Sequence, residues 1–389
     1  MSDNIVIVAA RRTAIGSFQG QFAPVKSPVL GSAAISAALT DAGIAGEDVS
    51  EVIMGCVLPA GVGQAPARQA SLGAGLPVSA GCTTINKVCG SGMKAVMQGH
   101  DAIRAGSAEI VVAGGMESMT NAPYMVDRGL RMGHVQALDH MFFDGLQNPY
   151  DGQLMGPFGE QCVAKYGFTR EQQDDFSKAS VERAMAATDS GAFSAEIAPV
   201  TIKTRKGEVE VTSDEEPPRC DLGKLSSLRP ACAKDGTITA ASSSKISDGA
   251  AALVLMDAEN ARRRNLQPLA RIVAHATHSQ EPEWFTTAPV GAMQKVLAKA
   301  AWGVEDVDLF EINEAFAVVT MAAMKDLDLP HDKVNVNGGA CALGHPIGAS
   351  GARILVTLIH ALRTRGLKRG VASLCIGGGE ATAVAVELS

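Results

Sequence analysis

The sequence is poor in aromatic and in charged residues. Phe, Trp and Tyr make up 4% of its 389 residues, and Asp, Glu, Lys and Arg make up 19%, below the roughly 25% that is usual in soluble domains. Together with a hydrophobic content of 46%, this excludes an intrinsically disordered chain. The net charge of −7 excludes a general nucleic-acid binder, although a local basic pocket could still hold one anionic ligand.

Long apolar runs are missing as well. The longest apolar runs, such as residues 250–256, are far shorter than the roughly 18 residues needed to cross a bilayer, so no membrane partner is expected. A strand-like run begins at residue 5 with no basic segment, apolar core or cleavage site before it, which predicts a cytoplasmic protein. Eight cysteines in such a chain are expected to be reduced thiols.

Motifs for metals and nucleotides are also missing. No Cys-x-x-Cys pair, His-Glu-x-x-His motif or paired Cys/His spacing occurs, so no metal site is predicted. No P-loop occurs, and no Gly-x-Gly-x-x-Gly motif joins a strand to a helix. Glycine is instead abundant, with 41 residues, which indicates many tight turns or close backbone approaches.

A faint duplication organises the chain. Residues 38–49 (ALTDAGIAGEDV) resemble residues 296–307 (VLAKAAWGVEDV), and each segment lies between two strand-like runs. The helix-opening segments at Cys89 (CGSGMK) and Gly348 (GASGAR) are also alike. Strands that alternate with helices predict α/β halves, each with a buried sheet.

The duplication is interrupted once. The second half closes with a strand at residues 381–387, whereas the first half finds the equivalent strand only at 250–256. We therefore predict an insertion between the fourth and fifth strands of the first half. The predicted parts are an N-terminal half (1–117 and 248–267), an inserted loop domain (118–247) and a C-terminal half (268–389).

Cys89 is the first candidate for chemistry, because ligand sites in such folds lie where strands end and helices begin. A helix N-terminus favours the thiolate form of a cysteine, and Gly90 and Gly92 would let a substrate come close. The residue is therefore either a nucleophile or a small side chain that packs in a tight turn.

Three further candidates lie in the other half. His345, in a glycine-rich loop, fits the base partner of a thiol, although lone histidines are more often structural. Cys375 ends a buried strand before three glycines whose N–H groups could bind an anion, or it is simply a buried small residue. Asn313 also ends a strand, where it is either functional or the N-cap of the next helix.

Four motifs carry a resemblance to a known family. They are NKVCGSG around Cys89, NEAFA at 313–317, GGACALGHPIGASG at 338–351 and CIGGGE at 375–380. Through them the sequence resembles the thiolase family along essentially its whole length. The resemblance implies an α/β fold with a five-layer α-β-α-β-α core from two duplicated halves and an inserted loop domain that holds coenzyme A (CoA). It also implies a homo-oligomer, a dimer or a tetramer, and residues 125–141 resemble the protruding loop that joins dimers of the family into tetramers.

The resemblance implies an acyltransferase. Thiolases cleave a 3-ketoacyl-CoA with free CoA or run the reverse Claisen condensation. The expected activity is that of an acetyl-CoA C-acetyltransferase, which converts two acetyl-CoA to acetoacetyl-CoA and CoA. The alternative is a 3-ketoacyl-CoA thiolase of fatty-acid β-oxidation that accepts longer chains.

The resemblance also assigns roles to the candidates. Cys89, activated by His345, would carry the acyl group as a thioester, and Cys375 would be the general base or acid. Asn313 would hold a water that stabilises the enolate oxygen together with His345. The backbone N–H groups of Cys89 and Gly377 would bind the oxyanion of acyl transfer.

Substrate contacts follow from the same resemblance. Ser244 would face the pantetheine of CoA, and Met155 and Phe316 match the acyl pocket of the family. Leu146 is placed with them as a substrate- or CoA-binding residue. No metal or organic cofactor is expected, because the CoA thioesters are substrates whose α-protons are already acidic.

Three positions of the pocket wall depart from the family. Leu154 replaces a usual His, Cys232 replaces a usual Phe, and Phe285 stands near a usual Met-Gly pair. These changes leave the reaction class intact and leave the acyl chain length open. If Cys89 and Cys375 come within disulfide range, we also expect oxidation to inactivate the protein reversibly.

Two other functions compete with this interpretation. A decarboxylating ketoacyl synthase-like enzyme would share the fold, but it is expected to use Cys-His-His or Cys-His-Asn, and Cys375 at the base position argues against it. A non-catalytic scaffold that carries CoA or lipid would be expected to have lost the reactive side chains. All four are present here.

Overall fold

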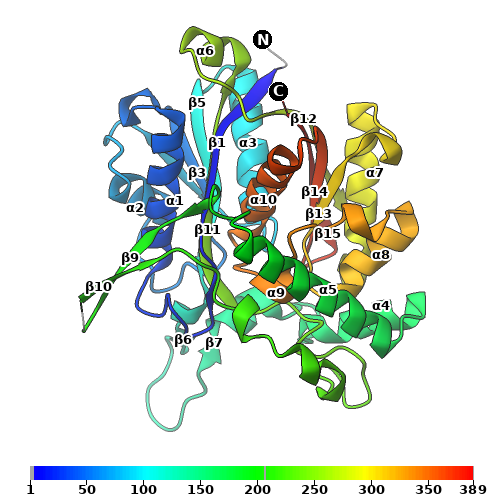
Figure 1. Ribbon diagram of the computed structural model, residues 1–389. Coiled ribbons are helices and arrows are strands. Elements are labelled where there is room, and N and C mark those ends of the chain that lie inside the picture. Colours follow the sequence, from blue (N-terminus) through cyan, green and yellow to red (C-terminus); the bar gives the residue numbers. More distant parts are fainter. Residues whose placement is uncertain (1–3, 206, 389) are drawn as a thin grey trace.

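The computed structural model describes residues 4–205 and 207–388, and a single mixed sheet runs through it (Figure 1). Its main strand order is β13-β14-β15-β12-β1-β11-β5-β3-β4, and the short strands β2 and β8 pair with β11 and β1. The strands are β1 (Ile5–Thr13), β2 (Gly16–Ser17), β3 (Glu51–Gly55), β4 (Gly81–Ile85), β5 (Ile110–Ser118), β8 (Ile197–Ala198), β11 (Ser247–Asp257), β12 (Ala270–Ser279), β13 (Leu309–Ile312), β14 (Arg369–Ile376) and β15 (Glu380–Leu388).

The sheet consists of two halves that repeat one topology. Outward from the centre, one half runs β1-β11-β5-β3-β4 and the other β12-β15-β14-β13. A parallel bridge between Phe310 and Val334 stands where a strand equivalent to β4 would lie. The halves join where β1 pairs antiparallel with β12 over two residue pairs, Val6 with Arg271 and Ile7 with Ala270. The predicted duplication is confirmed; the predicted domain boundaries stay a prediction.

Helices complete a five-layer arrangement (Figure 1). The outer layers are α1 (Ser27–Ala42) with α2 (Pro66–Gly73) on one side and α7 (Ala288–Ala300) with α8 (Ala317–Leu327) on the other, and the central layer is α3 (Ser91–Ala105) with α10 (Ser350–Arg365). The alternation along β1 explains the layering, because successive side chains point to opposite faces. Val6 and Val8 pack toward α1, while Ile5 and Ile7 pack toward the central helices.

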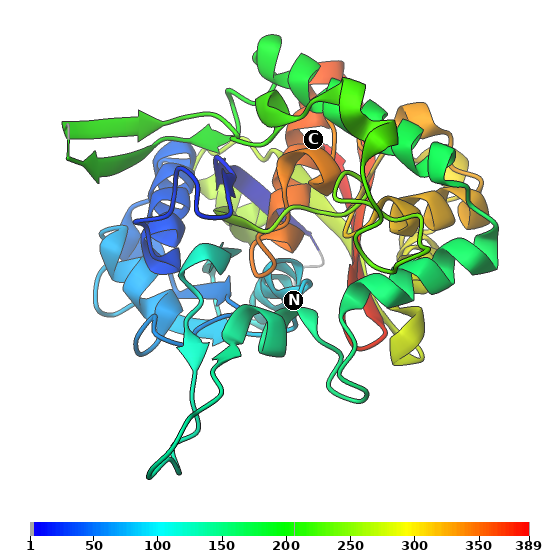
Figure 2. The same ribbon diagram turned by 90° about the horizontal axis from the view of Figure 1, so that it is seen from below.

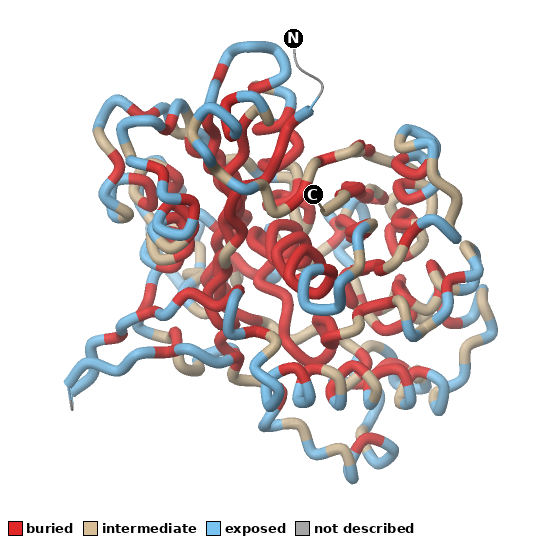
Figure 3. Tube along the Cα trace, turned by 45° about the horizontal axis from the view of Figure 1, so that its top comes forward, coloured by how far each residue is buried: buried red, intermediate tan, exposed pale blue. Residues whose placement is uncertain are grey.

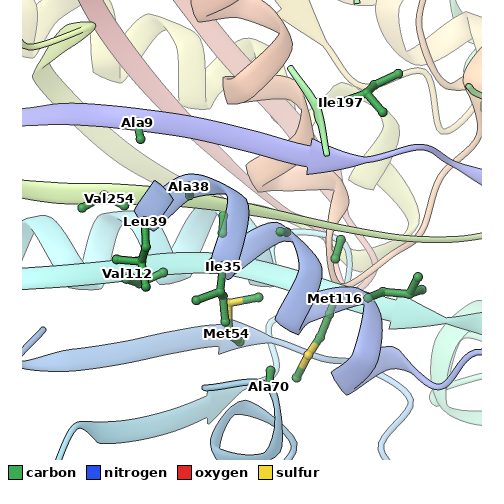
Figure 4. Close-up of a cluster of buried hydrophobic side chains, with 14 of the residues drawn as sticks. Ala9, Ile35, Ala38, Leu39, Met54, Ala70, Val112, Met116, Ile197 and Val254 are labelled. Carbon is green, nitrogen blue, oxygen red and sulfur yellow. The ribbon is translucent and has the colours of Figure 1, made fainter. Parts of the chain in front are cut away.

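Buried segments are concentrated around the helix α10 and the strands beside it, as Figure 3 shows. In α10, 13 of 16 residues are buried, including the polar side chains of Arg353, Thr357 and His360. The outer core beside α1 includes the buried side chains of Ile35, Leu39, Val112 and Val254 (Figure 4).

Between β5 and β11 the chain crosses one end of both halves and returns to the sheet only at the short strand β8 (Figures 1 and 2). This segment holds β6 (Tyr124–Met125), β7 (Leu138–Asp139), α4 (Met155–Tyr166), α5 (Arg170–Asp189), β9 (Val200–Thr204) and β10 (Gly207–Val211); α6 (Ala258–Arg263) follows β11 and α9 (Ala340–Leu343) precedes α10. Thr169 and Gln172 form a capping box that begins α5. Within the described residues, no helix combines the length and apolar character that a membrane span requires.

Candidate active site

Cys89 lies on a strained turn directly before α3. Val88, a β-branched residue, has a φ of 46°, a left-handed conformation that costs about 1–3 kcal/mol. The turn is held by the Ser91 hydroxyl, which accepts the Lys87 N–H at 2.8 Å and donates to the Val88 carbonyl at 2.7 Å. Strain that is held in place so firmly is typical of a residue presented for function.

Burial controls the protonation of Cys89. Desolvation raises the pKa of the Cys89 thiol to about 11, although the backbone N–H of Gly377 hydrogen-bonds to the sulfur and lowers it. The sequence alone led us to expect that the helix N-terminus would favour a thiolate. In the structure the effect of burial on the pKa is larger, so Cys89 is a neutral thiol at rest. The thiol needs a base before it can act as a nucleophile.

His345 can be that base. Its Nδ1 lies 2.6 Å from the Ser350 hydroxyl, which donates to the Pro346 carbonyl at 2.9 Å. Because the Ser350 hydroxyl donates its proton to that carbonyl, its oxygen accepts a proton from His345 Nδ1. The lone pair of the imidazole is therefore on Nε2. Burial, with a smaller contribution from the Arg353 charge, lowers the pKa of His345 to about 3, so the imidazole is neutral at rest.

Asn313 lies beside His345 in the buried site. The Asn313 Nδ2 is 3.5 Å from His345 Nδ1. Among the described residues, neither Asn313 Oδ1 nor His345 Nε2 has a hydrogen-bond partner, although both atoms are buried. Two buried acceptors without donors need an explanation, and the proton of a thiol or a water would supply one. Asn313 is not a helix N-cap, since α8 begins at Ala317 with Phe316 as its cap.

Cys375 is the second thiol of the site. It lies in β14, one residue before the strand ends, and is buried. Burial raises its pKa well above the usual range, and the next contribution is the electrostatic interaction with Cys89, which would oppose two thiolates in the site. Cys375 packs with Phe158 and Phe285. All eight cysteines lie in the described part of the chain and are free thiols.

The glycines around the thiols have different functions. A Cβ on Gly90 would lie 2.3 Å from Ile376 Cδ1, and one on Gly92 would lie 2.8 Å from the backbone nitrogen of Ala352. These two glycines allow the halves to pack closely, so the expectation that they admit substrate was wrong. At Gly377 the nearest atoms are 3.7 Å away or more, which leaves the backbone open to a ligand.

A cavity of about 330 Å³ opens beside these residues. His345 lines it, together with every predicted substrate-binding residue: Leu146, Met155, Ser244 and Phe316. Two of the three wall positions that depart from the family, Leu154 and Cys232, also line it. The third, Phe285, lies behind the wall in the cluster around Cys375. A second cavity of about 390 Å³ shares Met155 and is lined by Val88 and Gly377, the neighbours of Cys89.

Comparison with known proteins identifies the family. The model for the thiolase N-terminal domain matches residues 5–259, and the model for the thiolase C-terminal domain matches residues 266–388. The chain belongs to the thiolase family.

Individual relatives are similar to this chain over nearly its whole length. An acetyl-CoA acetyltransferase from Chromobacterium violaceum is 51% identical over 388 residues, which cover 98% of this chain and 99% of the relative. The crystal structure of the Bacillus anthracis acetyl-CoA acetyltransferase is 42% identical, covers 99% of both chains and superposes with a TM-score of 0.97. A thiolase from Ascaris suum, solved in complex with coenzyme A, is 43% identical, covers 100% of both chains and has a TM-score of 0.94.

One residue of this thiolase site was missed from the sequence. Glu117 is buried near the end of β5, and its carboxylate accepts N–H groups of Val57 at 2.9 Å, Leu58 at 3.2 Å and Gly348 at 2.9 Å. It therefore ties a loop of the N-terminal half to the loop that carries His345. The available signal was a charged side chain inside an otherwise apolar run, IVVAGGMES, because buried carboxylates need partners.

The buried Glu117 carboxyl is expected to make the free energy of unfolding depend on pH. Burial raises the pKa of Glu117 from 4.5 to about 7, against the lowering effect of its three N–H donors. Between these values the unfolded chain loses the proton and the folded chain keeps it, so this contribution to stability falls as pH rises. We expect the wild type to lose about 3 kcal/mol relative to Glu117→Gln between pH 4.5 and above pH 7.

Urea unfolding of both proteins across this range measures the difference. Glu109→Gln, at an exposed glutamate directly before β5, is the matched control and should track the wild type. A constant difference between the wild type and Glu117→Gln at all pH values would contradict the prediction.

Proposed function

We propose that this thiolase is an acetyl-CoA C-acetyltransferase, which condenses two acetyl-CoA to acetoacetyl-CoA and CoA and also runs the reverse thiolysis. Three observations support the proposal: Asn313 lies beside His345, His345 lines the cavity of about 330 Å³, and Cys375 interacts electrostatically with Cys89 of the other half. The names of the relatives at about half identity support the acetyl substrate.

The first half of the reaction loads Cys89. His345 Nε2 takes the thiol proton, and the sulfur attacks the carbonyl carbon of acetyl-CoA. The backbone N–H groups of Cys89 and Gly377 stabilise the oxyanion. The bond from the carbonyl carbon to the CoA sulfur breaks, and CoA leaves with the proton of Cys375.

The second half forms the new carbon–carbon bond. The Cys375 thiolate removes an α-proton from the second acetyl-CoA, and the enolate oxygen is stabilised by the Nε2 proton of His345 and by a water held on Asn313. The enolate carbon attacks the acetyl group, and the bond to Cys89 breaks. Cys89 recovers its proton from His345, so both thiols and the imidazole return to their starting forms.

The segment of residues 118–247 is proposed to hold CoA. Most of the cavity wall comes from this segment, including Leu146, Met155 and Ser244, and the Ser244 N–H is fixed by a 3.0 Å hydrogen bond to the carbonyl of Ala315. In the proposed complex, the pantetheine of CoA lies between this segment and Phe316, in contact with the cavity wall. Neither a metal nor an organic cofactor takes part in the proposed steps, because the α-proton of a thioester is already acidic enough for Cys375 to remove and the CoA sulfur is a good leaving group.

The homo-oligomer is also part of the proposal. The segment from β6 to β7 projects away from the body of the chain (Figure 2), and it exposes large apolar side chains at Tyr124, Val126, Leu130, Met132 and Val135. Exposed apolar side chains in one projecting segment are typical of an interaction surface. A dimer or tetramer of this chain would cover them, and light scattering would give its mass.

The acyl chain length provides the test of the proposed activity. We expect kcat/KM for thiolysis of 3-ketoacyl-CoA esters to be highest for acetoacetyl-CoA and to fall by at least about tenfold for each pair of added carbons that the cavity cannot hold. A flat or rising series would instead favour the broader 3-ketoacyl-CoA thiolase. Turnover of malonyl thioesters without CoA-dependent cleavage would contradict thiolase chemistry altogether.

A further inference from the structure

Three side chains of types that can bind metals meet outside the active site. His100 and Asp101 lie in the C-terminal half of α3, and His275 lies in β12, so both halves of the fold contribute. None of the three lines either cavity described above. In the described residues this is the group of His, Cys, Asp and Glu side chains whose ligand atoms converge closely enough to hold an ion.

The three ligand atoms form a small triangle. His100 Nδ1 is 3.0 Å from Asp101 Oδ1, His275 Nε2 is 2.9 Å from the same oxygen, and the two nitrogens are 3.2 Å apart. A metal bound at about 2.0–2.2 Å separates its ligands by about 2.9 Å at octahedral angles and about 3.4 Å at tetrahedral angles. The triangle thus has the dimensions of one face of a metal coordination shell.

The same three atoms can form hydrogen bonds when no ion is bound, because each imidazole can donate its proton to Asp101 Oδ1. In the other tautomers the two ring nitrogens, which are 3.2 Å apart, direct their lone pairs toward the same space as the carboxylate oxygen. A cation at the centre of the face would pair with all three lone pairs at once.

The donor set indicates which cation fits. Two imidazoles and one carboxylate suit Zn²⁺, Co²⁺ or Ni²⁺, whereas Mg²⁺ and Ca²⁺ prefer all-oxygen sites. We propose that His100, Asp101 and His275 form a binding site for a divalent transition-metal ion of the zinc class. His100 is buried and Asp101 is exposed, so the open side of the site faces solvent, from which water ligands complete the shell.

The position of the site gives the ion a mechanical effect. The helix α3 begins two residues after Cys89, and β12 forms the junction with β1. An ion between them would link the helix that presents the nucleophile to the other half of the fold. Because the ion binds the folded chain, it raises the stability in proportion to the logarithm of its concentration. The sequence showed no such site, since its ligands are 175 residues apart and match no spacing motif.

Titration of the metal-stripped full-length protein tests the proposal. We expect one Co²⁺ per chain to bind with a visible ligand-field spectrum and without the charge-transfer absorption that a cysteine thiolate would add. Zn²⁺ should displace Co²⁺ and raise the melting temperature. His275→Ala and Asp101→Asn should each weaken binding by at least about tenfold, whereas His134→Ala, at an exposed histidine between β6 and β7, should bind as the wild type does.

The two variants separate loss of the site from loss of the fold. Asp101 is exposed, so Asp101→Asn is expected to fold, and both variants should retain acetoacetyl-CoA thiolysis in the absence of metal. Binding that is equally tight in His275→Ala, or that gives a thiolate absorption, would overturn the proposal. So would the absence of saturable binding in the wild type, which would make the cluster a hydrogen-bonded network without affinity for metals. Neither result depends on the proposed acyltransferase activity.

Discussion

Replacing Cys89 with alanine is expected to lower both thiolysis and condensation by about 10⁴-fold or more. The proposed mechanism splits the reaction into two acyl transfers that both pass through the Cys89 sulfur, so no residual route remains when the sulfur is removed. Steady-state rates in both directions measure the loss. Mass spectrometry of acid-quenched wild type, incubated with acetyl-CoA, should find the acetyl group on the peptide that contains Cys89.

The control for this variant is another thiol of the same half. Cys82, half-buried in β4, lines neither cavity, and Cys82→Ala should retain the wild-type rate. An acetyl group found on Cys375 instead of Cys89 would reverse the assignment of the two thiols. Substantial turnover by Cys89→Ala would remove the covalent mechanism.

Replacing Cys375 with alanine is expected to lower kcat by about 10²–10⁴-fold, the usual effect of losing a general base. Cys89 should still accept acetyl groups from acetyl-CoA, because the CoA sulfur can leave as a thiolate and be protonated by water. The lost step is removal of the α-proton. The expected signature is therefore an acetylated protein that neither forms acetoacetyl-CoA nor exchanges the methyl protons of acetyl-CoA with deuterated water.

A second buried thiol tests whether burial alone matters. Cys162 is buried in α4 and packs in a different cluster from Cys375, so Cys162→Ala should still exchange α-protons. If Cys375→Ala exchanged α-protons at the wild-type rate, another group would have to be the base. His345 would then be the first candidate, since its Nε2 is buried with no partner among the described residues.

The fold could be predicted to a large extent because its signals are local. The strand-like run that begins at residue 5 predicted β1 (Ile5–Thr13), and the short run at residues 250–256 predicted β11, which spans Ser247–Asp257. The repeat predicted two halves with the same topology, and motifs alone linked the chain to its family. Each of these signals lies within a few consecutive residues, where the period of a strand or helix determines which side chains share a face.

The active site was predicted in its members but not in its electrostatics. Asn313 lies beside His345 and Cys375 interacts electrostatically with Cys89, yet the helix N-terminus at Cys89 suggested a thiolate that burial does not allow. The degree of burial depends on how closely α3, α10 and the ends of the strands pack, and a linear pattern does not contain that distance.

The secondary-structure elements, their duplication and the reactive side chains thus follow from the sequence itself, since periodicity and motifs are properties of neighbouring residues. The tertiary structure alone decided which distant groups meet and which charges they carry. It placed Glu117 against the Gly348 loop and brought His100 and Asp101 to His275. It also gave Gly90 a packing function, because Ile376 of the other half fills the space beside it. Such contacts join residues more than a hundred positions apart, and only the packing of the two halves determines them.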